Sequence, residues 1–376
     1  MEKPRTLFWE WLVLGRDSPL RALLAREAAR SGFGGVGDAP FGFLPALRFE
    51  RKKAGGDGRV ERALLEPLGR PTRALKAELA RAAGRSLAFF AWFGASDLHW
   101  ENLVLGRARG GELVFAPLDI ELVLAELSFP TETQLLPHAD PEYRALYQHA
   151  AGVRRILPFL GKPVAAAELL SLAAAYREML LFLDDHARTV AKLLDELPEL
   201  RRAPIRVCLR STAEYVTLGE HEHDPPLLAA EVEQLARGDV PYFFRLYGQR
   251  GIRYYADASL ETLARLPLSG DVPRPAPLLS LGRGLRAPSR RRLAEQGLLL
   301  VLGAFDHAAL RGRHDHAGLS VSFGARSLEV RFPGGELACP RNLRSFVSSV
   351  YLPCRCGEVR SVFVPPVTRC TLHSTQ

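Results

Sequence analysis

Two short acidic motifs, separated by one hairpin pattern, constrain this chain more than any other feature of its sequence. The first, Ser96–Asn102, reads S-D-L-H-W-E-N, and the second, Asp119–Glu121, reads D-I-E. Between them, the apolar segments Leu103–Leu105 and Leu113–Ala116 flank a basic, glycine-containing turn. Apolar segments joined by such a turn predict a β-hairpin. We therefore expect a loop, a hairpin and a second acidic loop at the end of the hairpin.

The residue types in these loops are those of a phosphotransfer site. Kinase-type enzymes place an Asp near the attacking hydroxyl and an Asn for Mg²⁺ on one loop, and a further metal-binding carboxylate after a strand. Mg²⁺ prefers oxygen ligands, which Asn102, Asp119 and Glu121 offer. Either motif alone would be better explained as a helix cap, a turn or a solvated strand end. Their order and spacing favour phosphotransfer chemistry, but they do not indicate a substrate.

A third stretch, Ile205–Leu218, alternates in polarity and is rich in β-branched residues, which predicts a strand. Its side chains include a dense set of hydrogen-bond donors, which are Arg206, Arg210, Thr212 and Tyr215. The alternative for the arginines is a strand edge protected by charge. Beyond Pro225-Pro226 we expect a helix over Leu227–Ala236, followed by the run Gly238–Phe243, which reads G-D-V-P-Y-F.

Together these motifs resemble the dehydratase domain of class II lanthipeptide synthetases, the LanM family. In that family the catalytic segment reads much like T-D-x-H-x-E-N-L-I, then P-x-x-I-D-x-E, R-x-x-x-R-x-T-x-x-Y and G-D-I-P-Y-F. The matching residues here, in the same order, are Asp97, His99, Glu101, Asn102, Asp119, Glu121, Arg206, Arg210, Thr212, Tyr215 and Gly238–Phe243. A Leu135–Pro137 element also lies where the family has G-L-L-P. The resemblance covers about residues 86–245.

The resemblance implies an α+β fold of the lipid-kinase-like, bilobal type and an ATP- and Mg²⁺-dependent reaction. Such enzymes phosphorylate Ser and Thr in the core of a ribosomal precursor peptide that also carries a leader, and then eliminate phosphate to give dehydroalanine or dehydrobutyrine. The implied catalytic-loop residues are Asp97, His99 and Asn102, the implied Mg²⁺ ligands are Asn102, Asp119 and Glu121, and the implied elimination residues are Arg206 and Thr212, with Arg210 as a further catalytic candidate. An Arg suits elimination because its planar fork of donors can hold the leaving phosphate.

The chain departs from the family pattern ahead of the catalytic loop. Only about 95 residues precede Asp97, so we expect a reduced N-lobe. The family's Y-K-P-R lysine motif is absent, and the nearest substitute is Lys52 or Lys53, followed by the glycine run Gly55–Gly58. These lysines could hold an ATP phosphate, or they could belong to a solvated basic loop. The alternatives are a compact enzyme, loss of kinase activity, and elimination from a peptide that is already phosphorylated.

Length and composition set the outer limits. The chain has 376 residues, of which 47% are hydrophobic and 24% charged, so it can bury a substantial core in about two or three subdomains. Its net charge of +8 is compatible with an acidic partner such as nucleotide phosphates or an acidic leader peptide. The basic residues are scattered and no nucleic-acid motif accompanies them, so nucleic acid is not an expected partner. The N-terminal segment resembles neither a signal peptide nor a membrane span, which predicts a cytoplasmic protein without a membrane partner.

We expect three regions along the chain. Residues 1–95 form the reduced N-lobe and a helical lead-in, 96–265 the kinase-like catalytic and elimination core, and 266–376 a β-rich C-terminal subdomain that follows a Pro- and Gly-rich boundary. Amphipathic helices are predicted over Val164–Leu197. The strands expected in the last region are Gly297–Gly303, Leu319–Phe323 and Ser327–Phe332.

The C-terminal tail holds most of the cysteines. Cys354, Cys356 and Cys370 with His373 could bind zinc, although C-x-C is an unusual spacing and free, partly buried thiols are the default. The zinc-dependent cyclase motifs of lanthipeptide synthetases do not follow, so a separate cyclase is an expected partner.

The sequence thus predicts a lanthipeptide-type dehydratase. The first alternative is a peptide or small-molecule kinase that stops at the phosphorylated product. It would need Asp97, Asn102 and Asp119 but not Arg206 or Thr212. The second alternative is a catalytically impaired scaffold that binds a precursor peptide, which the reduced N-lobe would favour.

Overall fold

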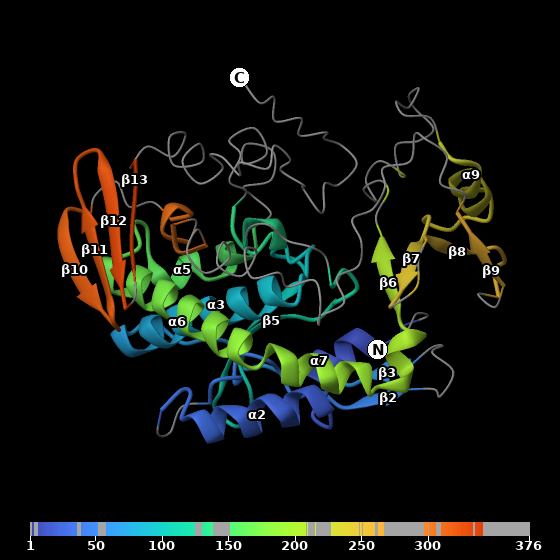
Figure 1. The fold of residues 1–376 in the computed structure, drawn as a ribbon, viewed down its shortest axis with the longest axis horizontal. Helices are drawn as coiled ribbons and strands as arrows, with labels where there is room; N and C mark the ends of the chain where they lie inside the picture. Colours follow the sequence, from blue (N-terminus) through green and yellow to red (C-terminus); the bar gives the residue numbers. More distant parts are fainter. Residues whose placement is uncertain are drawn as a thin grey trace.

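The computed structural model describes residues 2–3, 7–35, 39–51, 58–124, 130–137, 151–207, 209, 215, 227–247, 249, 251–259, 262–266, 297–299, 301–305, 310–333 and 335–340 (Figure 1). Its α-helices are α1 (Phe8–Leu14), α2 (Pro19–Ser31), α3 (Arg73–Trp92), α5 (Leu157–Leu160), α6 (Ala166–Asp185), α7 (Ala187–Asp195) and α9 (Ala229–Ala236). Short 3₁₀ helices are η1 (Pro130–Thr133), η2 (Gly152–Arg155) and η3 (Pro198–Arg201). The strands are β1 (Glu2–Lys3), β2 (Phe49–Arg51), β3 (Gly58–Val60), β4 (Leu103–Arg107), β5 (Leu113–Pro117), β6 (Pro204–Val207), β7 (Phe243–Leu246), β8 (Arg253–Tyr255), β9 (Leu263–Arg265), β10 (Gly312–His316), β11 (Leu319–Phe323), β12 (Ser327–Phe332) and β13 (Gly335–Pro340).

The centre of the molecule is the closely packed pair α3 and α6. Helix α3 begins at Thr72, whose hydroxyl accepts a hydrogen bond from the Leu75 amide (3.2 Å), as an N-cap residue does. Most of its second half is buried. At Gly84 a Cβ atom would overlap with the backbone of Leu172 on α6, so only glycine allows the two helices to approach this closely. Small and apolar side chains therefore set the spacing of the core.

The N-terminal region combines two helices with a small antiparallel sheet of order β1-β3-β2. Helix α2 is started by Ser18 and Pro19 and ended by Gly32, which adopts a positive φ of 68°. Phe33, just beyond the helix, stacks on Phe182 of α6 at 4.4 Å between ring centroids. This stacking attaches α2 to the central helix pair.

Helix α1 contacts a distant part of the chain. The indole nitrogen of Trp9 donates to the backbone oxygen of Pro204 at the start of β6, at 2.8 Å. Both residues are buried. The N-terminal helix thus fixes the beginning of the strand that carries Arg206.

The hairpin β4–β5 lies between the two acidic motifs, as the sequence predicts. Its register pairs Leu103 with Pro117 and Leu105 with Phe115. Strand β5 is buried along its whole length, and the Phe115 amide donates to the Phe43 carbonyl at 3.0 Å. Burial on both sides fixes the point where β5 ends and the second acidic motif begins.

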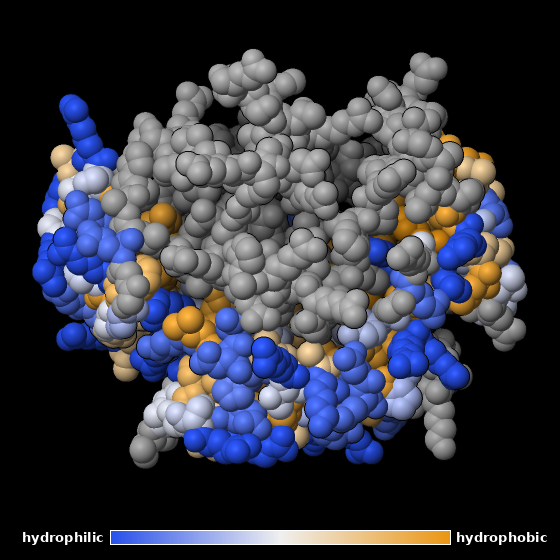
Figure 2. Space-filling model, in the orientation of Figure 1, coloured by the Kyte–Doolittle hydropathy of each residue, from blue (hydrophilic) through white to orange (hydrophobic). Residues whose placement is uncertain are grey.

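Two four-stranded antiparallel sheets, β6-β7-β8-β9 and β10-β11-β12-β13, lie on opposite sides of the helix pair (Figure 1). The first packs against α9 through a small cluster that includes Ala230, Phe243 and Ile252. The second sheet packs against α6, where the side chains of His316 and Ser171 are hydrogen-bonded at 2.9 Å. Figure 2 shows hydrophobic residues on the side formed by α9 and β7–β9, whereas the β10–β13 side is mainly hydrophilic.

The mixed helical and antiparallel content confirms the predicted α+β class. The strands expected over Leu319–Phe323 and Ser327–Phe332 are β11 and β12, and the helix expected after Pro226 is α9. The finer prediction of a bilobal, lipid-kinase-like arrangement remains a prediction. Among the described residues, no helix is both long enough and apolar enough to span a bilayer.

One predicted strand is wrong, and another is confirmed only in part. Residues 297–299 and 301–303 are helical, and Leu298 and Leu302 are buried in the main core. A short apolar run without alternation fits a buried helix as well as a strand. Among the described residues of Ile205–Leu218, residues 205–207 are extended as part of β6, residue 209 lies in a bend and Tyr215 is helical.

Candidate active site

The first acidic motif forms a loop that begins where α3 ends and leads into β4. Backbone hydrogen bonds anchor both neighbours of Asp97. The Ser96 amide donates to Leu122 O and the Leu98 amide to Thr133 O, each at 3.0 Å. Ser96 and Leu98 are buried, whereas the Asp97 side chain keeps 46% of its surface exposed. The loop therefore presents Asp97 from a fixed backbone.

Asp97 has a positive φ of 63°, which is uncommon for a residue other than glycine. Asp tolerates this conformation better than most residues because its short polar side chain can hydrogen-bond locally. Leu124 (φ 55°) and Gln134 (φ 66°) also have positive φ and lie in the segments that hold this loop. Such backbone strain is concentrated at functional sites, where the surrounding structure holds it in place.

His99 lies between two carboxylates. Its Nε2 is 3.8 Å from Asp97 Oδ1, and its Nδ1 is 3.9 Å from Glu101 Oε2. The Glu101 amide donates to Nδ1 at 3.3 Å, so in this geometry Nδ1 is the acceptor and the ring proton is on Nε2. The proton-bearing side of the imidazole therefore faces Asp97.

Asn102 joins the two acidic loops. Its side-chain nitrogen donates to the backbone oxygen of Asp97 at 2.8 Å. Its backbone oxygen accepts from the amide of Leu118, the neighbour of Asp119, at 3.0 Å. Because Nδ2 is used for the loop, Oδ1 is the atom of this amide that can accept a donor or bind a cation. Asn102 thus has a structural role that the sequence did not predict.

The second acidic motif follows β5 directly and lies beside the first. Although 46% of the Asp97 side chain is exposed, its partial removal from water raises the pKa of the carboxyl. The charge of His99, when it is protonated, and that of Arg206 lower this pKa, whereas the charges of Asp119 and Glu121 raise it, with a net increase over the ordinary value. These effects require the groups to be close in space. The structure therefore brings together Asp97, His99, Asp119, Glu121 and Arg206.

Arg206 reaches this cluster from β6. Its backbone amide donates to Glu121 O at 3.2 Å, and its Nη1 forms an ion pair with Glu121 Oε2 at 2.9 Å. Both side chains are largely buried, with 20% and 19% of their surfaces exposed. The guanidinium carbon also lies 5.7 Å from the centre of the Tyr242 ring. Tyr242 belongs to the Gly238–Phe243 run, so all of the main sequence motifs meet here.

Several predicted site residues cannot be placed. Lys52, Lys53, Arg210 and Thr212 lie outside the described residues, as do Cys354, Cys356, Cys370 and His373. Tyr215 is described, and its hydroxyl donates to Glu231 Oε1 at 2.7 Å within the β6–β9 region. Tyr215 therefore helps to hold α9 in place.

Sequence reasoning missed two groups at the site. Tyr242 was part of a recognised motif, but no property of the motif indicated that its ring would cover Arg206. Trp100 is an exposed aromatic residue of the catalytic loop, and Arg155 lies over its ring at 5.3 Å and donates to its carbonyl at 2.6 Å. An aromatic residue within the catalytic-loop motif could have indicated Trp100. No pattern in the sequence indicates Arg155, which is 55 residues away in the chain.

The cluster is rich in oxygen atoms that can bind a metal ion, but these atoms do not form a complete coordination sphere. Within the described ranges, no group of three or more His, Cys, Asp or Glu side chains is arranged to hold a metal ion. Mg²⁺ at phosphotransfer sites is commonly held by one or two carboxylates together with substrate phosphates. The donor set around Asn102 and Asp119 fits that requirement, while Glu121 is engaged by Arg206.

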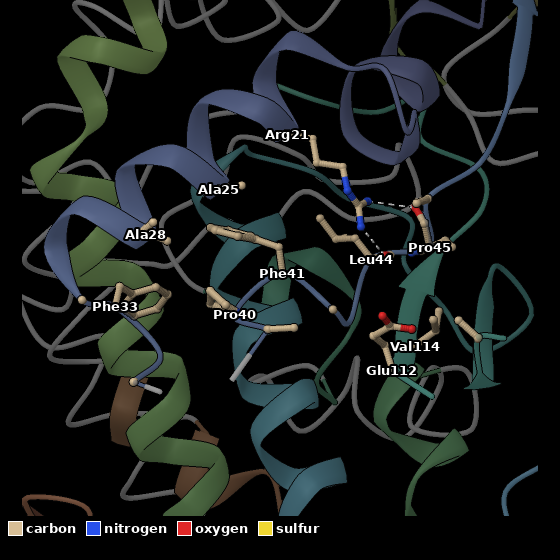
Figure 3. A pocket seen from close by; sticks show the side chains of 17 residues that line it. Arg21, Ala25, Ala28, Phe33, Pro40, Phe41, Leu44, Pro45, Glu112 and Val114 are labelled. Carbon is tan, nitrogen blue, oxygen red and sulfur yellow. Dashed lines mark hydrogen bonds between the residues drawn. The ribbon is translucent and has the colours of Figure 1, made fainter. Parts of the chain in front are cut away.

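A hollow of about 730 Å³ lies apart from this cluster, between α2, residues 39–46 and the turn of the β4–β5 hairpin (Figure 3). Its walls are mostly alanines, glycines, prolines and phenylalanines. At one end Arg21 donates to the carbonyls of Leu44 and Pro45, each at 3.0 Å. Burial lowers the pKa of Arg21, and the charge of Glu112 partly offsets this effect. No predicted site residue lines the hollow.

Neither the protein-family models nor the curated proteins searched match this chain. The resemblance to lanthipeptide dehydratases therefore rests on the sequence motifs alone.

Proposed function

We propose that this protein is a dehydratase of the lanthipeptide type, which phosphorylates Ser or Thr of a ribosomal precursor peptide with ATP and then eliminates phosphate. The observation that carries the proposal is that backbone hydrogen bonds (Ser96 to Leu122 and Leu118 to Asn102) hold the two acidic loops side by side, and that Arg206 is paired with Glu121 of the second loop. These residues come from three separate stretches of sequence, each of which carries one of the motifs.

In the phosphorylation step Asp97 accepts the proton of the substrate hydroxyl. The oxygen then attacks the γ-phosphorus of ATP, the bond to the β-phosphate oxygen breaks, and ADP leaves with that electron pair. A general base works best when its pKa approaches the working pH, and burial raises the pKa of Asp97 in that direction. His99 Nε2 lies 3.8 Å from the same carboxylate, close enough to interact with its charge.

Phosphoryl transfer requires neutralisation of the phosphate charges. Asn102 Oδ1 and Asp119 are the residues that would hold Mg²⁺, which would neutralise charge on the ATP phosphates, and Glu121 would join them when Arg206 releases it. Lys52 or Lys53 would contact the nucleotide from the N-terminal side. Asn102 also fixes the spacing between the two acidic loops through its bonds to both.

In the elimination step a base removes the α-proton of the phosphorylated residue, a C=C bond forms, and the Cβ–O bond breaks. The phosphate leaves with that electron pair as inorganic phosphate. Arg206 and Thr212 would hold the phosphate as it leaves, with Arg210 as a further donor. The fork of the Arg206 guanidinium suits this task because it stabilises charge that develops on the leaving oxygen.

A kinase without elimination is the second candidate, and one observation favours it. The Arg206 guanidinium already has a carboxylate partner in Glu121, so its charge is accounted for without a phosphate. In that case Arg206 would serve to fix the acidic loop.

Intact mass spectrometry separates these functions. The protein would be incubated with Mg²⁺, ATP and a synthetic peptide that carries Ser, Thr and Cys. A loss of about 18 Da per site indicates dehydration, whereas a gain of about 80 Da indicates phosphorylation alone. For a dehydratase, Arg206→Ala should convert the loss into the gain. The exposed Arg202→Ala is the matched control and should behave as the wild type. No mass change, with either ATP or a phosphoserine form of the peptide, would contradict both functions.

A further inference from the structure

The surroundings of Arg206 contain an aromatic residue with no role in the reaction described above. Tyr242 is 8% exposed, and its backbone amide donates to the side-chain oxygen of Gln234 at 2.8 Å. Gln234 is itself buried and bonds back to Ala230 O at 3.1 Å within α9. The ring of Tyr242 is stacked with that of Tyr255 (14° between planes). The ring under Arg206 is therefore held in place by α9 and β8.

We propose that Tyr242 is a positioning residue for Arg206. The Tyr242 ring keeps the Arg206 guanidinium at the acidic cluster while the guanidinium N–H groups exchange partners. The inference rests on the proposed function, in which Arg206 holds a phosphate. Arg206 is fixed on its other sides by the β6–β7 pairing and by Glu121.

The physical reason lies in the geometry of the guanidinium. Its five N–H donors all point outward in the plane of the group. A contact through the face of a ring uses none of them. Arg206 can thus leave Glu121 for a phosphate oxygen, in part or wholly, without losing its contact with Tyr242. A side chain held by Glu121 alone would be released when that bond breaks.

The activity test compares variants at position 242 in the full chain. Tyr242→Leu removes the ring, and Tyr242→pentafluorophenylalanine keeps the shape of an aromatic residue but reverses the charge of the ring face. Both should slow elimination by about 5- to 30-fold, as expected for loss of a cation–π contact. Phosphorylation should be unaffected, so the phosphorylated peptide (a gain of about 80 Da) should accumulate. Tyr242→Phe keeps the ring face and should restore the wild-type product ratio.

Tyr254→Leu is the matched control. Tyr254 belongs to the same sheet, but it packs on Phe243 and lies near Glu233 instead of Arg206. Accumulation of phosphorylated peptide in this variant to the same degree would show a general packing effect and overturn the proposal. A wild-type product ratio in both Tyr242→Leu and the fluorinated variant would also overturn it.

A second measurement does not depend on catalysis. In protein labelled with ¹⁵N-arginine, the Nε–H signal of Arg206 is assigned by its disappearance in Arg206→Lys. Loss of the Tyr242 ring should shift this signal, whereas Tyr254→Leu should not. An unchanged signal in Tyr242→Leu overturns the proposal. If the wild type gives no modified peptide, the proposed function fails, and the NMR result still decides whether Tyr242 positions Arg206.

Discussion

The helix pair α3–α6 and the acidic cluster are neighbours in the chain but are built in opposite ways. Between the helices, small and apolar residues allow close approach, and Gly84 marks the tightest point. The cluster contains a residue with positive φ, several carboxylates and a largely buried ion pair. The helix pair is built for stability, whereas the cluster keeps groups together at an energetic cost. Local features that oppose stability are expected where a protein performs chemistry.

The largest expected effect is on activity at Asp97. Asp97→Asn should reduce the rate of peptide phosphorylation by about 10²- to 10⁴-fold, because the amide cannot accept the hydroxyl proton. Asn tolerates positive φ as well as Asp does, so the fold should be retained. The rate is measured by transfer of labelled phosphate from ATP to the peptide. Asp185→Asn, at the end of α6, is the control and should retain full activity.

The next effect is on stability at the helix pair. Gly84→Ala should lower the free energy of unfolding by about 1–3 kcal/mol, because the new methyl group overlaps with the backbone of α6. Gly69→Ala is the matched control, since a Cβ there meets no neighbour. It should leave stability unchanged or raise it by about 0.4–1 kcal/mol. Denaturant unfolding measures both, and an equal response of the two variants would contradict close packing at Gly84.

The ion pair between Arg206 and Glu121 should matter more than a pair at the surface. Glu121→Gln removes the negative charge from a largely buried ion pair, which should cost about 1–3 kcal/mol. Glu61→Gln breaks the exposed pair with Arg16 and should cost about 0–1 kcal/mol. Thermal unfolding at low and high salt compares the two variants. Added salt should reduce the loss of stability caused by Glu61→Gln but not the loss caused by Glu121→Gln.

The smallest expected effect is the pH dependence of stability at Asp97. Its pKa is raised in the folded protein, so the folded state binds this proton more tightly than the unfolded state. The charged carboxylate therefore destabilises the fold at pH values above the raised pKa, and this penalty disappears as the pH falls through that value. Asp97→Asn should melt slightly higher than the wild type at pH 8. The difference should shrink on acidification towards the ordinary value of 3.8. A difference that grows at low pH would show that the pKa is lowered instead.

The sequence predicted the elements whose structure is decided by residues close together in the chain. The β4–β5 hairpin, the strands β11 and β12, and the helix α9 follow from local alternation, turns and helix boundaries. The helical segments 297–299 and 301–303 were missed because an apolar run shows no periodicity, and burial against the core decided their structure.

The candidate site was predictable in its members but not in its contacts. Motif order pointed to Asp97, Glu121 and Arg206, but their proximity depends on how β6 meets the end of β5. The ion pair joins residues 85 apart in the chain, and no local pattern indicates it. The second role of Asn102 and the ring of Tyr242 beneath Arg206 depend in the same way on tertiary structure.

The hydrogen bond from the Trp9 indole to Pro204 has a consequence for how the chain folds as it is made. It joins residues 195 apart, so the ribosome must synthesise more than half of the protein before α1 can complete its contacts. Contacts of such long range form late because a large loop must first be closed. The strand that carries Arg206 is therefore expected to join the earlier helices only after they have packed.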